Sequence, residues 1–325
     1  MACFVGVDVS KAKFDCALLL PNSKFKSKVF SNDEAGFAAL LQWVGSHVPA
    51  GELLHLCMES TGSYHEALAG YAHDRGLSVS IVNPMLVKRF AELNRVRNKT
   101  DAGDAKCLAL YCRDQAPEPW QAPSLPVRAL QALVARLDTL LAMRQAEANR
   151  LEVAHPSVAD SIRKIMAELD AAIAQVKAQI AQTIDDDPDL KRRAELLETI
   201  PGLGERTIPQ LLAYIGNPNR FKSAKALIAY ASLAPLIRQS GTSLDKRRGT
   251  HGMGHKDFKR LLYFPAMVAG RYNPAIAAFW KRLKAQNKPG KVIVVACMHK
   301  LLNIVYAVLR SGKPFDPMHA GTAGA

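Results

Sequence analysis

The sequence has no pair of cysteines at CxxC spacing, which would be the first sign of a zinc site or a redox dithiol. Its six cysteines are scattered singly, mostly in apolar runs, as is typical of buried side chains in a reducing compartment. Neither a zinc site nor a disulfide framework is therefore indicated. The cysteines are Cys3, Cys16, Cys57, Cys107, Cys112 and Cys297.

Signals for export and membrane insertion are also missing. The N-terminus, MACFVGVDVS, has no basic segment ahead of an apolar core, so nothing marks the chain for export. The longest apolar stretch, Val292–Leu309, carries His299, Lys300 and Asn303 in its middle. We therefore expect a core helix rather than a membrane span, and a cytoplasmic bacterial protein with no membrane partner.

Acidic residues are scarce in the C-terminal part of the chain. The 325 residues carry a formal net charge of +14. Residues 1–187 hold 20 Lys and Arg against 22 Asp and Glu, whereas residues 188–325 hold 23 against 7. An excess this concentrated predicts a polyanionic partner, and we favour a nucleic acid over an anionic membrane surface.

In the first hundred residues, short apolar runs alternate with amphipathic stretches and turn residues, as in an α/β domain. We place this domain at residues 1–115. Three strands joined by turns, followed by strand–helix units, give the order of an RNase-H-like sheet. The expected strands are Cys3–Asp8, Asp15–Leu20, Lys24–Phe30, Leu53–Glu59 and Ser78–Val82. The expected helices are Asp33–Ser46 and Ser63–Arg75, with further helices through Arg113.

A helical segment is expected over residues 116–187. Helices at Val127–Glu152 and Val158–Ile184, separated by His155 and Pro156, predict an antiparallel hairpin. The second helix carries one apolar stripe, which suits either a bundle within one chain or a coiled coil between two copies, and both remain open. The stripe consists of Ile162, Ile165, Leu169, Ile173, Val176 and Ile180.

A basic, mainly α-helical domain is expected over residues 188–325. Within it, Leu196–Gly204 runs into Arg206–Gly216, which predicts a helix, a glycine-flanked turn and a second helix. A helix-hairpin-helix of this kind offers backbone N–H groups to a DNA phosphate, with Gly202 and Gly204 as its contact residues. The alternative is that these glycines serve packing alone.

Four carboxylates stand where chemistry is possible. Asp8 and Glu59 each end a predicted apolar strand, where a charge needs a partner such as a divalent cation, unless the strand end is simply exposed. Asp101 and Asp104 stand three apart at a helix start and share one face, although Asp101 can also be a helix cap. Together the four can gather around one or two Mg²⁺ ions, because that ion prefers oxygen ligands.

Several segments resemble the DEDD transposases of the insertion-sequence 110 family, and the likeness spans nearly the whole chain. It implies a RuvC-like N-terminal domain and a C-terminal transposase domain. The chain departs from the pattern at Gly252–His255, where many members carry Ser-Lys-x-Gly. The matching segments are Val7–Lys11, Glu59–Tyr64, Asn83 with Pro84, Lys99–Ala105, Ile200–Gly204, Ala234 with Pro235, and Gln239–Gly241.

The resemblance implies roles for individual residues. Asp8, Glu59, Asp101 and Asp104 would bind Mg²⁺, and Ser240 would attack DNA and form a covalent phosphoserine link. Members of this kind use a structured noncoding bridge RNA to choose donor and target DNA, and we expect a homo-oligomer, dimer or tetramer, at the nucleoid. From the residues alone, an ordinary Ser-Gly turn is the favoured interpretation of Ser240.

A flexible, glycine-rich basic stretch is expected beyond Ser240. It predicts phosphate contacts, the alternative being a solvated loop. Tyr263, Tyr272 and Trp280 can stack on bases, although their helical spacing favours core packing. With Gly202 and Gly204, the expected nucleic-acid contacts are Arg238, Lys246, Arg247, Arg248, Lys256, Lys259 and Arg260.

The sequence therefore predicts a Mg²⁺-dependent DNA recombinase that cuts and rejoins strands. Two alternatives remain open. One is a RuvC-type nuclease that hydrolyses DNA with metal-activated water, leaving Ser240 structural. The other is a non-catalytic nucleic-acid scaffold, whose acids only cap helices and strands.

Overall fold

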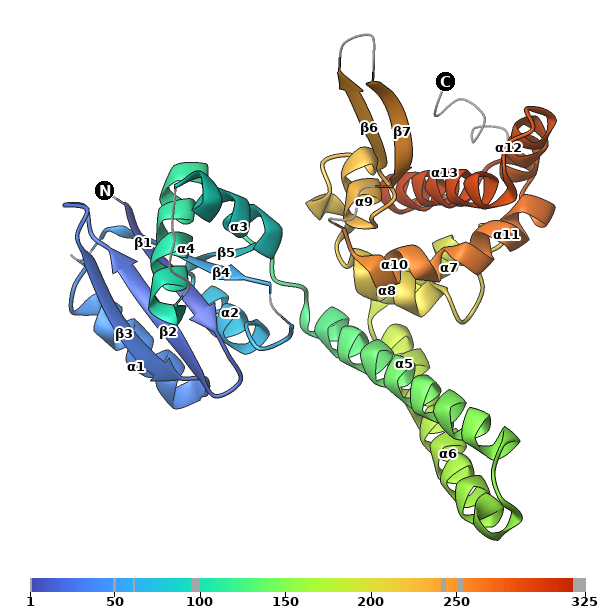
Figure 1. Cartoon of the computed structure of the whole chain (residues 1–325), viewed down its shortest axis with the longest axis horizontal. Helices are drawn as coiled ribbons and strands as arrows, with labels where there is room; N and C mark the ends of the chain where they lie inside the picture. Colours follow the sequence, from blue (N-terminus) through green and yellow to red (C-terminus); the bar gives the residue numbers. More distant parts are fainter. Residues whose placement is uncertain are drawn as a thin grey trace. The chain divides into compact units, whose positions relative to one another are not determined.

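The computed structural model describes residues 2–48, 51–60, 62–94, 100–240, 244–250 and 254–317, and all their side chains except those of Ala2 and residues 236–250. The chain divides into two compact units, Met1–Ala122 and Pro123–Ala325 (Figure 1). Each unit has a hydrophobic core of its own.

Unit 1 is built on a five-stranded sheet with the strand order β3-β2-β1-β4-β5. The strands β1 (Ala2–Val9), β2 (Lys13–Leu19) and β3 (Phe25–Ser31) form an antiparallel meander. The strands β4 (Leu53–Glu59) and β5 (Ser78–Val82) extend the sheet parallel to β1. This mixed sheet confirms the predicted α/β architecture, and β4 and β5 have the predicted bounds.

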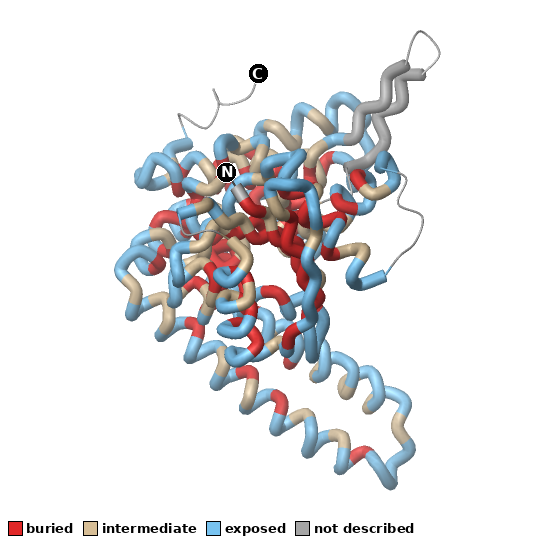
Figure 2. Tube along the Cα trace, turned by 90° about the vertical axis from the view of Figure 1, so that its left-hand side faces the viewer, coloured by how far each residue is buried: buried red, intermediate tan, exposed pale blue. Residues whose placement is uncertain are grey.

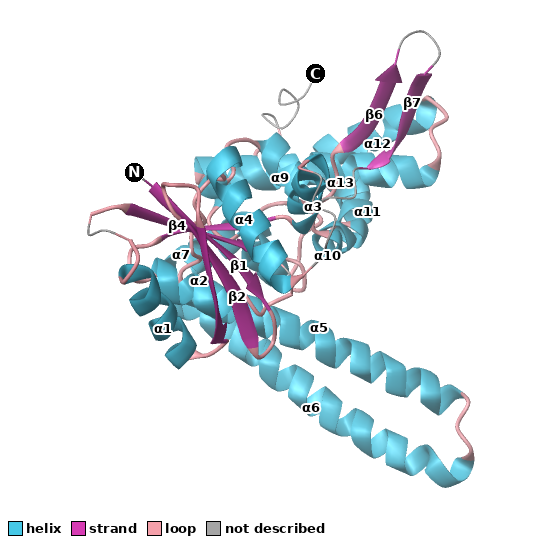
Figure 3. Cartoon of the chain, turned by 60° about the vertical axis from the view of Figure 1, so that its left-hand side comes forward, coloured by secondary structure: helices cyan, strands magenta, loops and turns pink. Residues whose placement is uncertain are grey.

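Helices cover both faces of this sheet (Figure 3). On one face, α1 (Glu34–Gly45) and α2 (Glu66–His73) bury apolar side chains against β1 and β4. On the other face, α3 (Pro84–Leu93) and α4 (Asp101–Gln115) form a second cluster with Cys57 of β4. The two faces are therefore packed separately, and they are distinguished by the alternation of side chains along each strand.

Gly6 allows α4 to lie directly on β1. A Cβ atom at Gly6 would stand 1.9 Å from the carbonyl oxygen of Ala105 and 2.4 Å from the amide nitrogen of Ala109. Any side chain would therefore push the helix away from the strand. This close approach fixes the height of α4 above the sheet.

Unit 2 begins with a long helical hairpin of α5 (Leu125–Glu152) and α6 (Pro156–Asp186). The base of the hairpin belongs to the core of the unit, whereas farther out only Leu140, Leu169 and Ile173 form a small buried cluster. Figure 2 shows the exposed surface of both helices along most of their length. The predicted antiparallel hairpin is thus present within one chain.

The hairpin leads into a group of shorter helices. They are α7 (Pro188–Glu198), α8 (Ile208–Ile215), the 3₁₀ turn η1 (Pro218–Arg220) and α9 (Ala224–Tyr230). A turn over residues 199–207 joins α7 to α8, as the sequence predicts.

A two-stranded hairpin follows α9, where the sequence predicted a flexible basic loop. Its strands are β6 (Pro235–Ser240) and β7 (Leu244–Thr250), paired antiparallel. The expectation of a flexible stretch from Lys246 onward is therefore wrong for Lys246–Thr250, and residues 251–253 lie outside the described part of the chain. The charged sequence of β7 lacks the apolar alternation that marks a half-buried strand, so no sequence pattern indicated it.

The last helices enclose the core of unit 2. They are α10 (Lys256–Leu261), α11 (Tyr263–Tyr272), α12 (Pro274–Ala285) and α13 (Gly290–Ser311). By length and composition α13 could cross a membrane, but 56% of its most apolar window is buried in the unit. It packs against α7, α9, α11 and α12 as the expected core helix.

Candidate functional site

Asp8 and Glu59 occupy adjacent positions at the carboxyl ends of two neighbouring parallel strands. The strands β1 and β4 are paired in register up to Val7 and Met58, so the next positions are those of Asp8 and Glu59. Both residues are half-buried. The two acids that the sequence placed at strand ends therefore lie at the same edge of the sheet.

Both carboxylates belong to the face of the sheet that α4 covers. Asp8 is two residues beyond Gly6, which contacts the backbone of α4. Glu59 is two residues beyond Cys57, whose thiol is hydrogen-bonded to that of Cys112 on α4. Because alternate residues of a strand share one face, Asp8 and Glu59 lie on the α4 side.

The first turn of α4 holds Asp101 and Asp104. The helix cap is Thr100, whose side chain accepts a hydrogen bond of 3.1 Å from the amide of Gly103. The alternative in which Asp101 is the cap is therefore wrong. Asp104 is half-buried and Asp101 is exposed, so both carboxylates are available for other partners.

The pKa of the Cys107 thiol is affected by one acid of α4 and one acid of β4. Burial raises its pKa most, and the negative charges of Asp104 and Glu59 raise it further. Cys107 lies one turn after Asp104 on α4 and is 5% exposed. Asp104 on α4 and Glu59 on β4 are therefore both near enough to Cys107 to influence it electrostatically.

A fifth carboxylate, Asp15, lies on the same face and was missed from the sequence. It stands directly opposite Asp8 in the pairing of β1 with β2, and its side chain is 12% exposed. The Nζ of Lys13 lies 3.1 Å from Oδ2 of Asp15 and 3.3 Å from Oδ2 of Asp101. The available signal was an acid at an inward position of an otherwise apolar strand.

Lys13 thus links β2 to the first turn of α4. The hydrogen bonds that its ammonium donates to Asp15 and Asp101 raise its pKa above the ordinary value. It supplies a positive charge at the edge of a group of carboxylates. Asp15 and Asp101 are consequently held in place in part by their ion pairs with Lys13.

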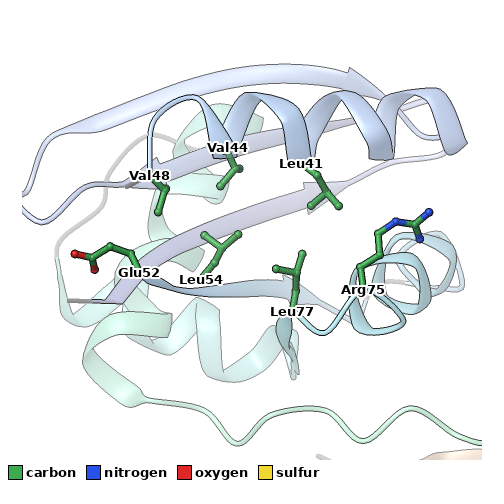
Figure 4. Close-up of a pocket in the computed structure, with 8 residues that line it drawn as sticks. Leu41, Val44, Val48, Glu52, Leu54, Arg75 and Leu77 are labelled. Atoms are coloured by element: carbon green, nitrogen blue, oxygen red, sulfur yellow. The ribbon is translucent and has the colours of Figure 1, made fainter. Parts of the chain in front are cut away.

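The opposite face of the sheet carries a cavity of about 440 Å³ between α1 and the strands (Figure 4). Leu41, Val44, Leu54 and Leu77 line its middle, and none of the carboxylates described above contributes to it. Since Leu54 is out of phase with Cys57, it faces away from α4. The cavity is therefore separate from the acidic edge.

Ser240 is the last residue of β6 and stands opposite Leu244 of β7. Its side chain and residues 241–243 lie outside the described part of the chain. The register also places Arg238 opposite Lys246 and Ile237 opposite Arg247, while Arg248 follows in β7.

The other predicted nucleic-acid contacts lie on α10 and in the turn before α8. Lys256 and Arg260 are exposed and Lys259 is half-buried. Gly202 has φ of +105°, and a Cβ there would stand 2.6 Å from the Cβ of Ala269. Packing against α11 therefore accounts for Gly202, whereas Gly204 has open space around it.

Comparisons with known proteins agree over almost the entire chain. Residues 5–154 match the sequence model of a family described as transposase, and residues 194–281 match the transposase IS116/IS110/IS902 family. The pilin gene-inverting proteins of Moraxella bovis and Moraxella lacunata are each 38% identical over 315 residues, which are 96% of this chain and 97% of each relative. The chain belongs to the IS110 family of transposases. It is therefore an enzyme of DNA recombination.

The two matched regions of the transposase contain the residues discussed above. The first holds Asp8, Glu59, Asp101 and Asp104, and the second holds Ser240. A solved structure of T. thermophilus RuvC in complex with Holliday junction substrate is 15% identical to the transposase. It covers 37% of this chain and 100% of its own, with a TM-score of 0.28.

Proposed function

We propose that this transposase cuts and rejoins DNA by Mg²⁺-dependent phosphoryl transfer, with Ser240 as the nucleophile. The observation that carries the proposal is the placement of Asp8 and Glu59 at one sheet edge, next to the first turn of α4 with its two acids. Carboxylates from separate elements lie on the same side of the sheet there, and phosphoryl transfer needs several such groups to hold a divalent cation.

The residues fit a magnesium site in donor chemistry. All of the donors are carboxylates, the ligand type that Mg²⁺ prefers, and the opposed pair of Asp8 and Asp15 favours a cation between the strands. Among the residues that the structure describes, no group of three or more His, Cys, Asp or Glu side chains stands close enough to hold a metal ion. Binding would therefore require some of these side chains to turn toward one another.

In this mechanism Asp8, Glu59, Asp101 and Asp104 would hold the ion. When bound, Mg²⁺ supplies positive charge that stabilises the attacking and leaving oxygens of the phosphoryl group. The Oγ of Ser240 loses its proton and forms a bond to the phosphorus, while the bond to the leaving DNA oxygen breaks and that oxygen takes up a proton. Rejoining reverses these steps with a second strand end, so the phosphodiester energy is conserved.

The basic residues of unit 2 would hold the nucleic acid. The register of β6 and β7 brings basic residues opposite one another, and Lys256 and Arg260 add charge on α10. We infer that the partners are donor and target DNA and a bridge RNA that selects them. The name of the Moraxella relatives, pilin gene-inverting protein, supports DNA rearrangement as the outcome.

A homo-oligomer also fits the surface of unit 2. Apolar side chains remain exposed near the far end of the α5–α6 hairpin, among them Met143, Val153, Val158 and Ile165. In an oligomer these side chains would pack against a second copy of the chain. A dimer or tetramer is therefore the expected assembly.

The decisive experiment is a cleavage assay with a labelled DNA substrate on denaturing gels, in the presence of Mg²⁺. Ser240→Ala should lose the covalent protein–DNA adduct while it retains DNA binding, and Ser243→Ala serves as the matched control. Asp8→Asn should lose both cleavage and heat released on titration with Mn²⁺. Cleavage products without any adduct in the wild type would instead establish hydrolysis, and the absence of both metal binding and cleavage would establish a scaffold.

A further inference from the structure

Helix α11 has its small residues inside and its large apolar residues outside. The residues that it buries are Pro265, Ala266 and Ala269. The exposed residues form two adjacent rows at a spacing of four, Phe264, Val268 and Tyr272 in one and Tyr263 and Met267 in the other, so they cover the outer half of the helix. These are Tyr263 at 37% exposure, Phe264 at 73%, Met267 at 37%, Val268 at 44% and Tyr272 at 69%.

The inner side of α11 has no room for large side chains. The Cβ of Ala269 is the atom that a Cβ on Gly202 would meet at 2.6 Å, and a Cβ on Gly270 would stand 2.7 Å from the ring of Trp280. Trp280 packs against the core as the sequence predicted, whereas core packing is wrong for Tyr272. Phe264 and Tyr272, which are 73% and 69% exposed, therefore contribute little to the core, and exposed apolar side chains grouped on one helix are typical of a contact surface.

The surroundings of this face are strongly basic. Residues 254–291 contain nine Lys and Arg and a single acid, Asp257. Arg260 lies near the end of α10, four residues before Phe264 in the sequence, and its side chain is 82% exposed, although Asp257 lies 3.3 Å away. Arg271 is exposed on the same face, next to Tyr272.

Exposed aromatic rings next to cationic side chains favour one class of partner, a nucleic acid. Bases offer flat π surfaces to exposed rings, and their phosphates pair with Arg and Lys. A second copy of the chain would instead bring two basic surfaces together, because a two-fold contact places the same patch on both sides. Charge complementarity therefore favours a nucleic acid, and the bases must be unpaired because those of a duplex already stack on each other.

We propose that the outer face of α11 binds unpaired bases by stacking on Phe264 and Tyr272, with Arg260 and Arg271 contacting phosphates. The inference rests on the proposed nucleic-acid partner, but on neither the metal ion nor Ser240. It gives the transposase a site for nucleic acid that has been opened, as strand exchange or an RNA guide requires.

The experiment uses the full-length protein and a single-stranded oligonucleotide that carries 2-aminopurine. Stacking should quench the 2-aminopurine fluorescence, and anisotropy gives the dissociation constant. Phe264→Leu and Tyr272→Leu keep an apolar side chain and a good helix former but remove the ring. Each should weaken binding about 5- to 150-fold, the range measured for loss of one stacked base. Phe264→Trp and Tyr272→Phe keep the ring and should retain both quenching and affinity.

Three results would overturn the inference. The first is unchanged quenching and affinity in both leucine variants. The second is binding of phosphatidylserine vesicles that depends on Phe264 and Tyr272 while oligonucleotide binding does not. The third is a dimer in light scattering that dissociates in the leucine variants without any change in quenching. Because none of these measurements requires cleavage, a failure of the proposed catalytic function would leave their outcome intact.

Discussion

At the scale of single residues, Lys13 is the side chain that ties the acidic edge together. It donates hydrogen bonds to Asp15 on β2 and to Asp101 on α4, and Asp15 in turn stands opposite Asp8. A positive charge in this position stabilises the carboxylates when no metal ion is bound. It also competes with an incoming cation for the same oxygens.

We therefore expect Lys13→Met to increase the affinity for divalent cations. Removal of one exposed charge near the site should tighten Mn²⁺ binding about two- to fivefold, measured by isothermal titration calorimetry. Lys11→Met is the control, because Lys11 is exposed in the turn just before β2. Equal Mn²⁺ affinity in the two variants would show that Lys13 does not interact with the site.

At the scale of elements, the distance between α4 and β1 decides where the helix acids stand. Gly6 leaves the helix backbone in contact with the strand, which brings the first turn of α4 to the sheet edge that carries Asp8 and Glu59. A methyl group at Gly6 would lift the helix and separate Asp104 from the strand acids.

Gly6→Ala should therefore lower both stability and metal affinity. Overpacking against a backbone that cannot yield costs about 1–3 kcal/mol of unfolding free energy, seen as a lower midpoint in urea. Gly45→Ala is the matched control, since a Cβ at that helical position meets no atom within 4 Å. The control should be neutral or slightly stabilising. If both alanine variants unfold at the same urea concentration, the packing argument fails.

The elements also separate what the sequence can predict from what it cannot. The strands of unit 1 are predictable because apolar runs such as Leu53–Glu59 end at turn residues. Strand β7 is not predictable in this way, because its charged sequence has no apolar alternation and its strand form depends on backbone pairing with β6. Asp15 was missed since its significance lies in its pairing with Asp8, which depends on register. Asp8 and Glu59 were singled out as acids at strand ends, and Asp101 and Asp104 as a pair on one helix face, whereas the family pattern added their expected roles.

At the scale of the whole molecule, positive charge is divided unequally between the two units. Unit 1 has 13 Lys and Arg and 13 Asp and Glu, whereas unit 2 has 30 and 16. Sequence-independent affinity for DNA should therefore reside in unit 2.

The salt dependence of duplex binding tests this division. The double variant Arg247→Gln, Arg248→Gln should weaken binding and reduce the slope of log K against log salt by about 2, because two phosphate contacts are lost. Lys24→Gln with Lys26→Gln in unit 1 removes the same charge and should leave the slope unchanged. An equal change of slope in both double variants would place DNA on unit 1 as well.

The backbone hairpin of β6 and β7 has a consequence for when the enzyme is active. A two-stranded ribbon is by itself marginally stable in water. Binding of an oligonucleotide to this basic sequence would stabilise the paired form, so amide hydrogen exchange in β6 and β7 should slow on its addition. Under the proposal that Ser240, the last residue of β6, is the nucleophile, its backbone would be held in place only once a substrate has arrived, which would limit stray attack between rounds of recombination.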